Sequence, residues 1–231
     1  MPGITPETVA FANRLINRGF QVFIPHLWGR VNKPAESIKN LAKVCISREI
    51  NAIATHRSSL ISDWLVHLCR KIKLDTHQPG VGLIGMCFSG GFVLSVMIDD
   101  SVIAPVMSQP AHVRGMMKKQ DRQTLGAPGK DIEAARKRAE RDDVHLMGFR
   151  FTKDIMCPGA RFDALEAVFG ERFHRFEIDS SLFNSHWIPL TAHSVFTLSY
   201  VDKPEHPTRH AFDALVDFYR SQFEKAYAKN S

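Results

Sequence analysis

Hydrophobic and polar positions alternate in blocks along the chain, and several of these blocks have the spacing of helices. Thr5-Pro6-Glu7 has the residues of a helix start, a capping hydroxyl followed by proline, and Gly19 marks the helix end. Apolar residues at helical spacing predict a second helix from Ser59 to Leu74, and a weaker helical pattern covers 34–53. The predicted buried stripes are Val9, Ala12, Leu15 and Ile16 in the first helix, and Leu60, Ile61, Trp64, Leu65, Leu68 and Ile72 in the second.

Short apolar runs fall between helical blocks and predict strands. These runs are Phe20 to Ile24, Val81 to Met86, Val102 to Met107, Val144 to Phe151 and Phe173 to Ile178. Helices are predicted at 89–99, at 159–169 and, after a long loop, at 207–228. Because nearly continuously apolar strands alternate with helices, the sequence predicts an α/β fold with a mostly parallel sheet covered by helices on both faces.

The length of 231 residues is that of one domain, so we expect residues 1–231 to form a single domain. Residues 111–143 are polar and contain the turn Gly-Ala-Pro-Gly at 126–129. We expect this stretch to leave the core as a loop followed by one amphipathic helix, and to form either a lid or a surface insertion.

The composition mainly excludes classes of function. The net charge is +6, but acidic and basic side chains are interleaved, so nucleic acid is not an expected partner. No apolar run is long enough to span a membrane and no signal-peptide pattern begins the chain, so we expect a cytoplasmic protein. The four cysteines form no Cys-x-x-Cys pair, and His206 and His210 lack an evident third ligand, so neither a disulfide scaffold nor a metal site is expected.

Ligands of parallel sheets bind beyond the carboxyl ends of the strands. The chemically useful side chains that follow the predicted strands are Cys87, Gln109, Asp154 and, in the long loop, His193.

Cys87 stands in the stretch Gly85-Met86-Cys87-Phe88-Ser89, between a strand and a helix. A nucleophile at such a turn needs small residues two positions away on each side, because the two backbones nearly touch. The helix N-terminus also favours the thiolate. Two alternatives remain: the motif shifted by two residues makes Ser89 the nucleophile, and Cys87 could be an ordinary buried cysteine beside a glycine-rich contact.

An acid and a histidine follow in the chain order that this kind of turn requires. Asp154 comes after the strand 144–151, and we favour it as the acid over Asp179. His193 is favoured as the general base over His186, which lies in the same loop.

With these residues the chain resembles the dienelactone hydrolase family of α/β-hydrolases. The matching segments are GITPETVAFANRLINRGFQVFIPHLWGR, GMCFSGG, FTKDIMCP and AHSVFT. The resemblance implies a cysteine hydrolase that acts on a small ester or lactone without a cofactor, through the triad Cys87, Asp154 and His193. It also implies an oxyanion site made by the backbone N–H of Phe88 and a second N–H near Gly3 and Ile4. A monomer or a homodimer is expected.

Two departures from the family pattern qualify this expectation. The family has strands and a His-Glu pair before the segment that begins here at Pro2, so we expect the fold to lack its first strands. The family's best-known members carry an arginine shortly after the histidine, where this chain has SVFT at 194–197, so activity on dienelactone itself is not expected. The alternative function is that of a catalytically impaired relative that binds a small ligand or a partner.

Overall fold

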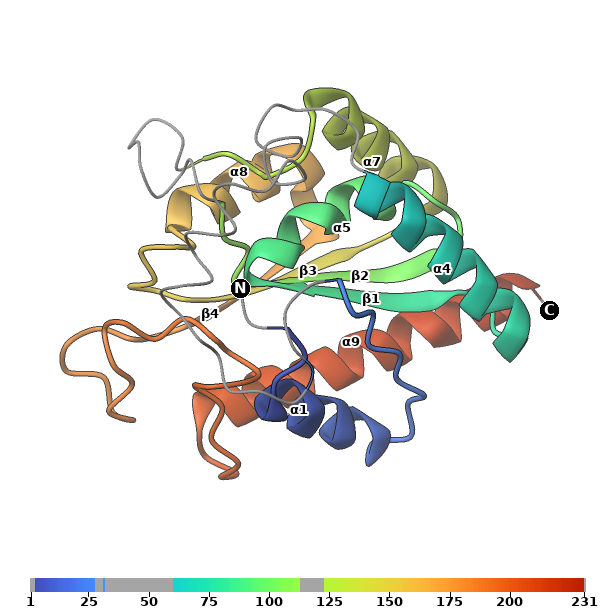
Figure 1. Cartoon of the computed structure of the whole chain (residues 1–231). Coiled ribbons are helices and arrows are strands. Elements are labelled where there is room, and N and C mark those ends of the chain that lie inside the picture. The colour runs from blue at the N-terminus through green and yellow to red at the C-terminus, as the bar shows by residue number, and fades with distance from the viewer. Residues whose placement is uncertain (1–2, 28–30, 32–59, 113–122, 231) are drawn as a thin grey trace.

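Four parallel strands form one sheet in the computed structural model, which describes residues 3–27, 31, 60–112 and 123–230 (Figure 1). The strands are β1 (Val81–Met86), β2 (Val102–Ser108), β3 (Leu146–Phe151) and β4 (Phe173–Ile178). They lie in the order β1-β2-β3-β4, and every neighbouring pair is parallel. The predicted α/β class with a mostly parallel sheet is therefore confirmed.

Helices cover both faces of this sheet. On one face lie α4 (Leu60–Thr76), α5 (Gly90–Val96), α7 (Gly129–Asp142) and α8 (Gly159–Phe169), and on the other lie α1 (Pro6–Ile16) and α9 (Pro207–Asn230) (Figure 1). Short 3₁₀ turns at Cys87–Ser89 and Gly170–Arg172 join elements. No helix within the described ranges is long and apolar enough to cross a membrane.

Two hydrophobic cores lie on opposite faces of the sheet, and the strands supply alternate residues to each. In β3, Leu146 faces the core under α4, α5, α7 and α8, whereas Met147 and Phe149 face the core under α1 and α9. The first core includes Phe92, Val93, Leu94, Met97, Phe162 and Leu165, and the second includes Phe11, Phe151, Phe196, Phe212, Leu215 and Val216.

Helix α1 begins as predicted, although its buried face differs. The Thr5 hydroxyl accepts the N–H of Thr8 at 3.3 Å, and Gly19 has the positive φ of +91° that ends the helix. The buried side chains centre on Phe11, whose ring stacks on Phe196 with centroids 5.3 Å apart. The predictions that Val9 and Ile16 are buried were wrong, since these side chains are 37% and 50% exposed.

Two further predictions about early elements were wrong. Residues 20–27 form no strand with any described residue, so the strand predicted at Phe20 to Ile24 is absent. Helix α4 buries Leu65 and Cys69, whereas Leu60 and Trp64, which were expected on its buried face, are exposed. The helical pattern at 34–53 lies outside the described residues.

The described part of the polar stretch at 111–143 packs on the sheet layer instead of leaving it. Ala135 and Ala139 of α7 are buried in the core, and the buried Arg138 donates to the carbonyls of Met97 and Val102. Residues 113–122 lie outside the described part of the chain. That residues 1–231 form a single domain, and that residues 111–143 form a lid or a surface insertion, stay predictions.

The connection from β1 to α5 brings two backbones into contact. A Cβ atom on Gly85 would lie 2.5 Å from the carbonyl oxygen of Ser89 and 2.8 Å from the Cα of Gly90. A Cβ on Gly90 would in turn lie 2.8 Å from the Pro110 side chain. The contacts at Gly85 are with backbone atoms, and a Cβ on Gly90 would also lie 2.9 Å from the backbone Cα of Pro110. Side-chain rotation cannot relieve such contacts, so the turn requires glycine at both positions.

We therefore expect Gly85→Ala to lower the free energy of unfolding by about 1–3 kcal/mol, because the added methyl group overpacks the turn. The matched control is Gly129→Ala, where a Cβ meets nothing within 4 Å. Urea unfolding of both variants measures the difference. Equal stabilities of the two variants would contradict the close approach.

Candidate active site

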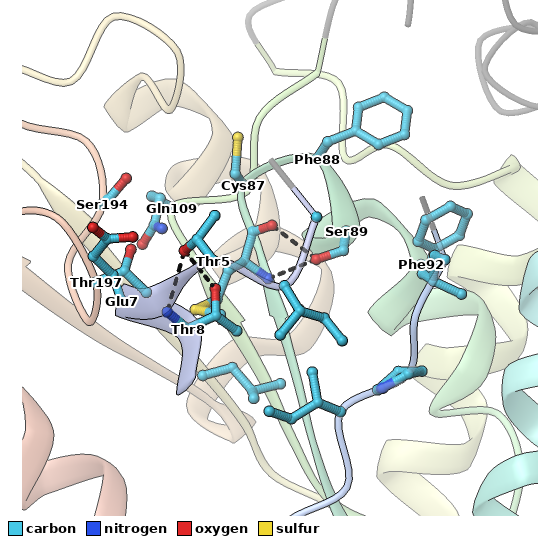
Figure 2. A pocket seen from close by; sticks show the side chains of 18 of the residues that line it. Thr5, Glu7, Thr8, Cys87, Phe88, Ser89, Phe92, Gln109, Ser194 and Thr197 are labelled. Carbon is cyan, nitrogen blue, oxygen red and sulfur yellow. Dashed lines mark hydrogen bonds between the residues drawn. The ribbon is translucent and has the colours of Figure 1, made fainter. Parts of the chain in front are cut away.

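Cys87 stands at the apex of the turn between β1 and α5. Its φ of +54° lies in the left-handed region, which costs a residue with a side chain about 1–3 kcal/mol and is held by the surrounding contacts. One such contact is the N–H of Ala111, which donates to the Cys87 carbonyl at 3.0 Å. The half-buried thiol lines a cavity (Figure 2).

The Ser89 hydroxyl folds back onto the same turn. It donates to the Met86 carbonyl at 2.8 Å and accepts the Met86 N–H at 2.9 Å (Figure 2). Both bonds tie it to the backbone. The geometry therefore disfavours Ser89 as a nucleophile. Its hydroxyl instead stabilises the turn that carries Cys87.

Asp154 and His193 meet beyond the ends of the strands. The Nδ1 of His193 lies 2.6 Å from the Oδ2 of Asp154, whose side chain is buried. The other oxygen of Asp154 accepts the N–H groups of Met156 at 2.9 Å and Cys157 at 3.2 Å. These three bonds fix the orientation of the carboxylate and, through it, the plane of the imidazole.

Cys87 interacts with the same imidazole. Since Nδ1 is taken by Asp154, Nε2 is the nitrogen left for the sulfur, and it is buried without a hydrogen-bond partner among the described residues. Burial lowers the pKa of His193, but the hydrogen bond to Asp154 and the nearby Cys87 outweigh it and raise the pKa to about 9. This environment favours the imidazolium.

The rival residues lie in other surroundings. Asp179 accepts the N–H of Ser181 at 2.9 Å, and this bond lowers its pKa. His186 is exposed, and its ring packs edge-on against His206 with centroids 5.4 Å apart. Within the described ranges, no group of three or more His, Cys, Asp or Glu side chains could hold a metal ion.

Gln109 links the end of β2 to the loop that carries His193. It is buried and has a positive φ of 35°, and its backbone N–H donates to the Phe149 carbonyl. Its Oε1 accepts the Ser108 hydroxyl and, at 3.3 Å, the N–H of Val195. Sequence reasoning selected Gln109 only as a residue after a strand, and the long-range bond to Val195 gives it a positioning role.

Arg161 was missed by sequence reasoning because arginine on a helix is usually exposed. Its side chain is only 1% exposed, and it donates to the carbonyls of Pro110, Thr124 and Met156. It thereby joins the segment after β2 to the loop of Asp154. The sequence gives no signal for this burial, because the carbonyls of Pro110 and Thr124 that it binds lie far away in the chain.

Two of the other cysteines are unlike Cys87. Burial raises the pKa of the Cys69 thiol to about 11 and that of the Cys157 thiol to about 12. Both side chains are buried, so neither is a reactive thiolate at neutral pH. Cys45 lies outside the described residues.

The cavity beside Cys87 has a volume of about 230 Å³, which suits a small ligand. It is lined by β1, by the turn at 87–89, by the start of α1, by residues 24–27 and by the segment after His193. Ile4 and Phe88 both line it, so the two predicted oxyanion residues border the same space as the thiol. Glu7 also lines the cavity, and sequence reasoning had given it only a role in starting the helix.

Comparison with known proteins identifies the family of the chain. The family model of the dienelactone hydrolases matches residues 1–128, which is more than half of the chain and includes the turn at Cys87. Asp154 and His193 lie beyond the matched residues. A search of curated proteins finds no match. From the family match and the parallel sheet together, the chain is a hydrolase of the α/β type and belongs to the dienelactone hydrolase family.

Proposed function

We propose that this protein hydrolyses a small ester or lactone through a Cys87-His193-Asp154 triad. The observation that carries the proposal is a buried His193 imidazole that is bonded to the Asp154 carboxylate and whose pKa is raised by Asp154 and by Cys87, the thiol on a strained turn beside a cavity. The proposed partner is a small molecule and not nucleic acid, and the proposed state is a cytoplasmic monomer or homodimer.

In the first half of the reaction, the Cys87 thiolate attacks the carbonyl carbon of the substrate. The carbonyl electron pair moves onto oxygen and then returns, so that the bond to the alkoxide leaving group breaks. The imidazolium of His193 donates its Nε2 proton to that leaving group. The products are an alcohol, or the ring-opened end of a lactone, and a thioester on Cys87.

In the second half, water attacks the thioester. Neutral His193 accepts a proton from this water through Nε2, while Asp154 holds the Nδ1 proton and stabilises the imidazolium that forms. The bond between sulfur and carbon breaks, the acid leaves, and the thiolate–imidazolium pair is restored. The raised pKa of His193 supports the imidazolium of this pair.

The negative oxygen of both tetrahedral intermediates needs hydrogen-bond donors. We propose the backbone N–H of Phe88, in the 3₁₀ turn, and that of Ile4, which lines the same cavity. The loss of one such donor costs about a hundredfold in rate or more.

The triad predicts selective chemistry at Cys87. We expect iodoacetamide at neutral pH to alkylate Cys87 well before Cys69 and Cys157, as peptide mapping would measure, because the other two thiols are buried and protonated. Hydrolysis of p-nitrophenyl acetate should be lost in Cys87→Ala and reduced about a thousandfold in Asp154→Asn.

Cys69→Ser is the control for this experiment, because Cys69 lies in the core away from the cavity. A Cys87 no more reactive than Cys69 would count against the triad. Absence of any ester hydrolysis by the folded, unlabelled protein, even though iodoacetamide reacts selectively with its Cys87, would favour the alternative of a non-catalytic relative.

The raised pKa of His193 also predicts how stability changes with pH. Since the pKa is about 9 in the folded state against an ordinary 6.5, the folded protein binds this proton more tightly than the unfolded chain. The stabilisation is complete below pH 6.5 and is lost as the pH rises towards 9. It amounts to roughly 3 kcal/mol.

Urea unfolding of the wild type and His193→Gln, at about pH 6 and about pH 9.5, measures this contribution. The wild type should exceed the variant by more at the lower pH. A difference between the two proteins that does not change with pH would show that His193 gains no proton affinity on folding.

A further inference from the structure

We infer that the cavity beside Cys87 selects a substrate group that donates hydrogen bonds, such as a hydroxyl or an ammonium, and excludes a carboxylate, and that Glu7 sets this preference. The inference rests on the proposed function, because it concerns the substrate that Cys87 would attack.

Charge gives the first argument. Among the described residues that line the cavity, Glu7 is the one Asp, Glu, Lys or Arg side chain, and His26 is the other lining residue, apart from Cys87, that can titrate. A carboxylate only accepts hydrogen bonds, so it attracts donors and repels a second carboxylate. The described part of the lining thus offers an anionic substrate no Lys or Arg side chain.

The distribution of polar groups gives the second argument. Figure 2 shows Glu7, Ser194 and Thr197 on one side of Cys87 and the rings of Phe88 and Phe92 on the other. Hydroxyl groups beside the carboxylate can accept as well as donate. The cavity therefore has a polar end rich in acceptors and an apolar end.

Glu7 is held in place by the helix start. It is the second residue of α1, directly after Pro6, and the first turn is fixed by the Thr5 cap. A carboxylate there also interacts favourably with the helix dipole, as acids at many helix starts do. Glu7→Gln keeps the shape of the side chain and removes its charge. A second acid in the first turn of another helix is the control, because its loss affects a helix dipole but not the cavity. Asp63 in the first turn of α4 is exposed and serves that purpose.

The direct test uses three thiol reagents of similar size: aminoethyl, hydroxyethyl and sulfonatoethyl methanethiosulfonate. In each case the Cys87 thiolate attacks the thiosulfonate sulfur, a mixed disulfide forms and methanesulfinate leaves. Labelling rates from mass spectrometry are divided by the rates with free mercaptoethanol. This removes the intrinsic reactivity of each reagent.

We expect Cys87 to react about tenfold faster with the ammonium reagent than with the sulfonate, after this normalisation. The net charge of +6 favours the sulfonate, so a preference for the ammonium cannot come from the charge of the whole chain. The ratio should fall to about one in Glu7→Gln and stay unchanged in Asp63→Asn. His26→Gln isolates any contribution from that side chain.

An equal or faster reaction with the sulfonate, or a ratio that Glu7→Gln leaves unchanged, would overturn the inference. A Cys87 that none of the reagents labels would overturn both the inference and the proposed function.

A substrate series separates the two claims. Glycerol monoacetate carries hydroxyl groups, and acetoxyacetate carries a carboxylate. Titration of the released acid should give a kcat/KM about tenfold higher for the former, and Glu7→Gln should remove the difference mainly by improving acetoxyacetate. Equal hydrolysis of both, lost in Cys87→Ala, would overturn the inference alone. Charge-selective labelling without hydrolysis of either ester would overturn the proposed function alone.

Discussion

The structure depends on the close approach of two backbones where β1 turns into α5. Gly85 and Gly90 leave no room for a side chain, and Cys87 between them takes a left-handed φ of +54°. This geometry decides where the sulfur lies and presents it to the cavity and to His193. The bond from Ala111 to the Cys87 carbonyl and the packing of Pro110 on Gly90 then tie the turn to the end of β2.

Much of the sheet could be predicted from the sequence, because buried parallel strands leave a strong pattern. The bounds of β1, β4 and α8 agree with the predicted ones, since turn residues flank each apolar run. The strand expected at Phe20 to Ile24 failed for a physical reason. An apolar run shows that a segment is partly buried, as Phe20 and Val22 are, but not that another strand lies beside it to share hydrogen bonds.

Some residues of the candidate site could be predicted from the sequence and others could not. Cys87, Asp154 and His193 could be selected because strand ends and chain order are visible in the sequence. The bond from Gln109 to Val195, the burial of Arg161 and the place of Glu7 in the cavity could not. Each depends on contacts between segments far apart in the chain. Such contacts leave no periodic pattern of residues, so a single sequence does not reveal them.

The pairing of the first and last helices on one face bears on the order of folding. The ring of Phe11 packs on Phe196 and Phe212, and Arg18 pairs with Asp213, so this core joins residues nearly two hundred positions apart. The turn at Cys87 needs mostly local contacts. Val195 and Phe196, close to His193 in the chain, belong instead to the core under α1 and α9, which can form only when both ends of the chain are present. On a ribosome, the thiol would thus be built early and would meet its imidazole only after the C-terminal helix had emerged.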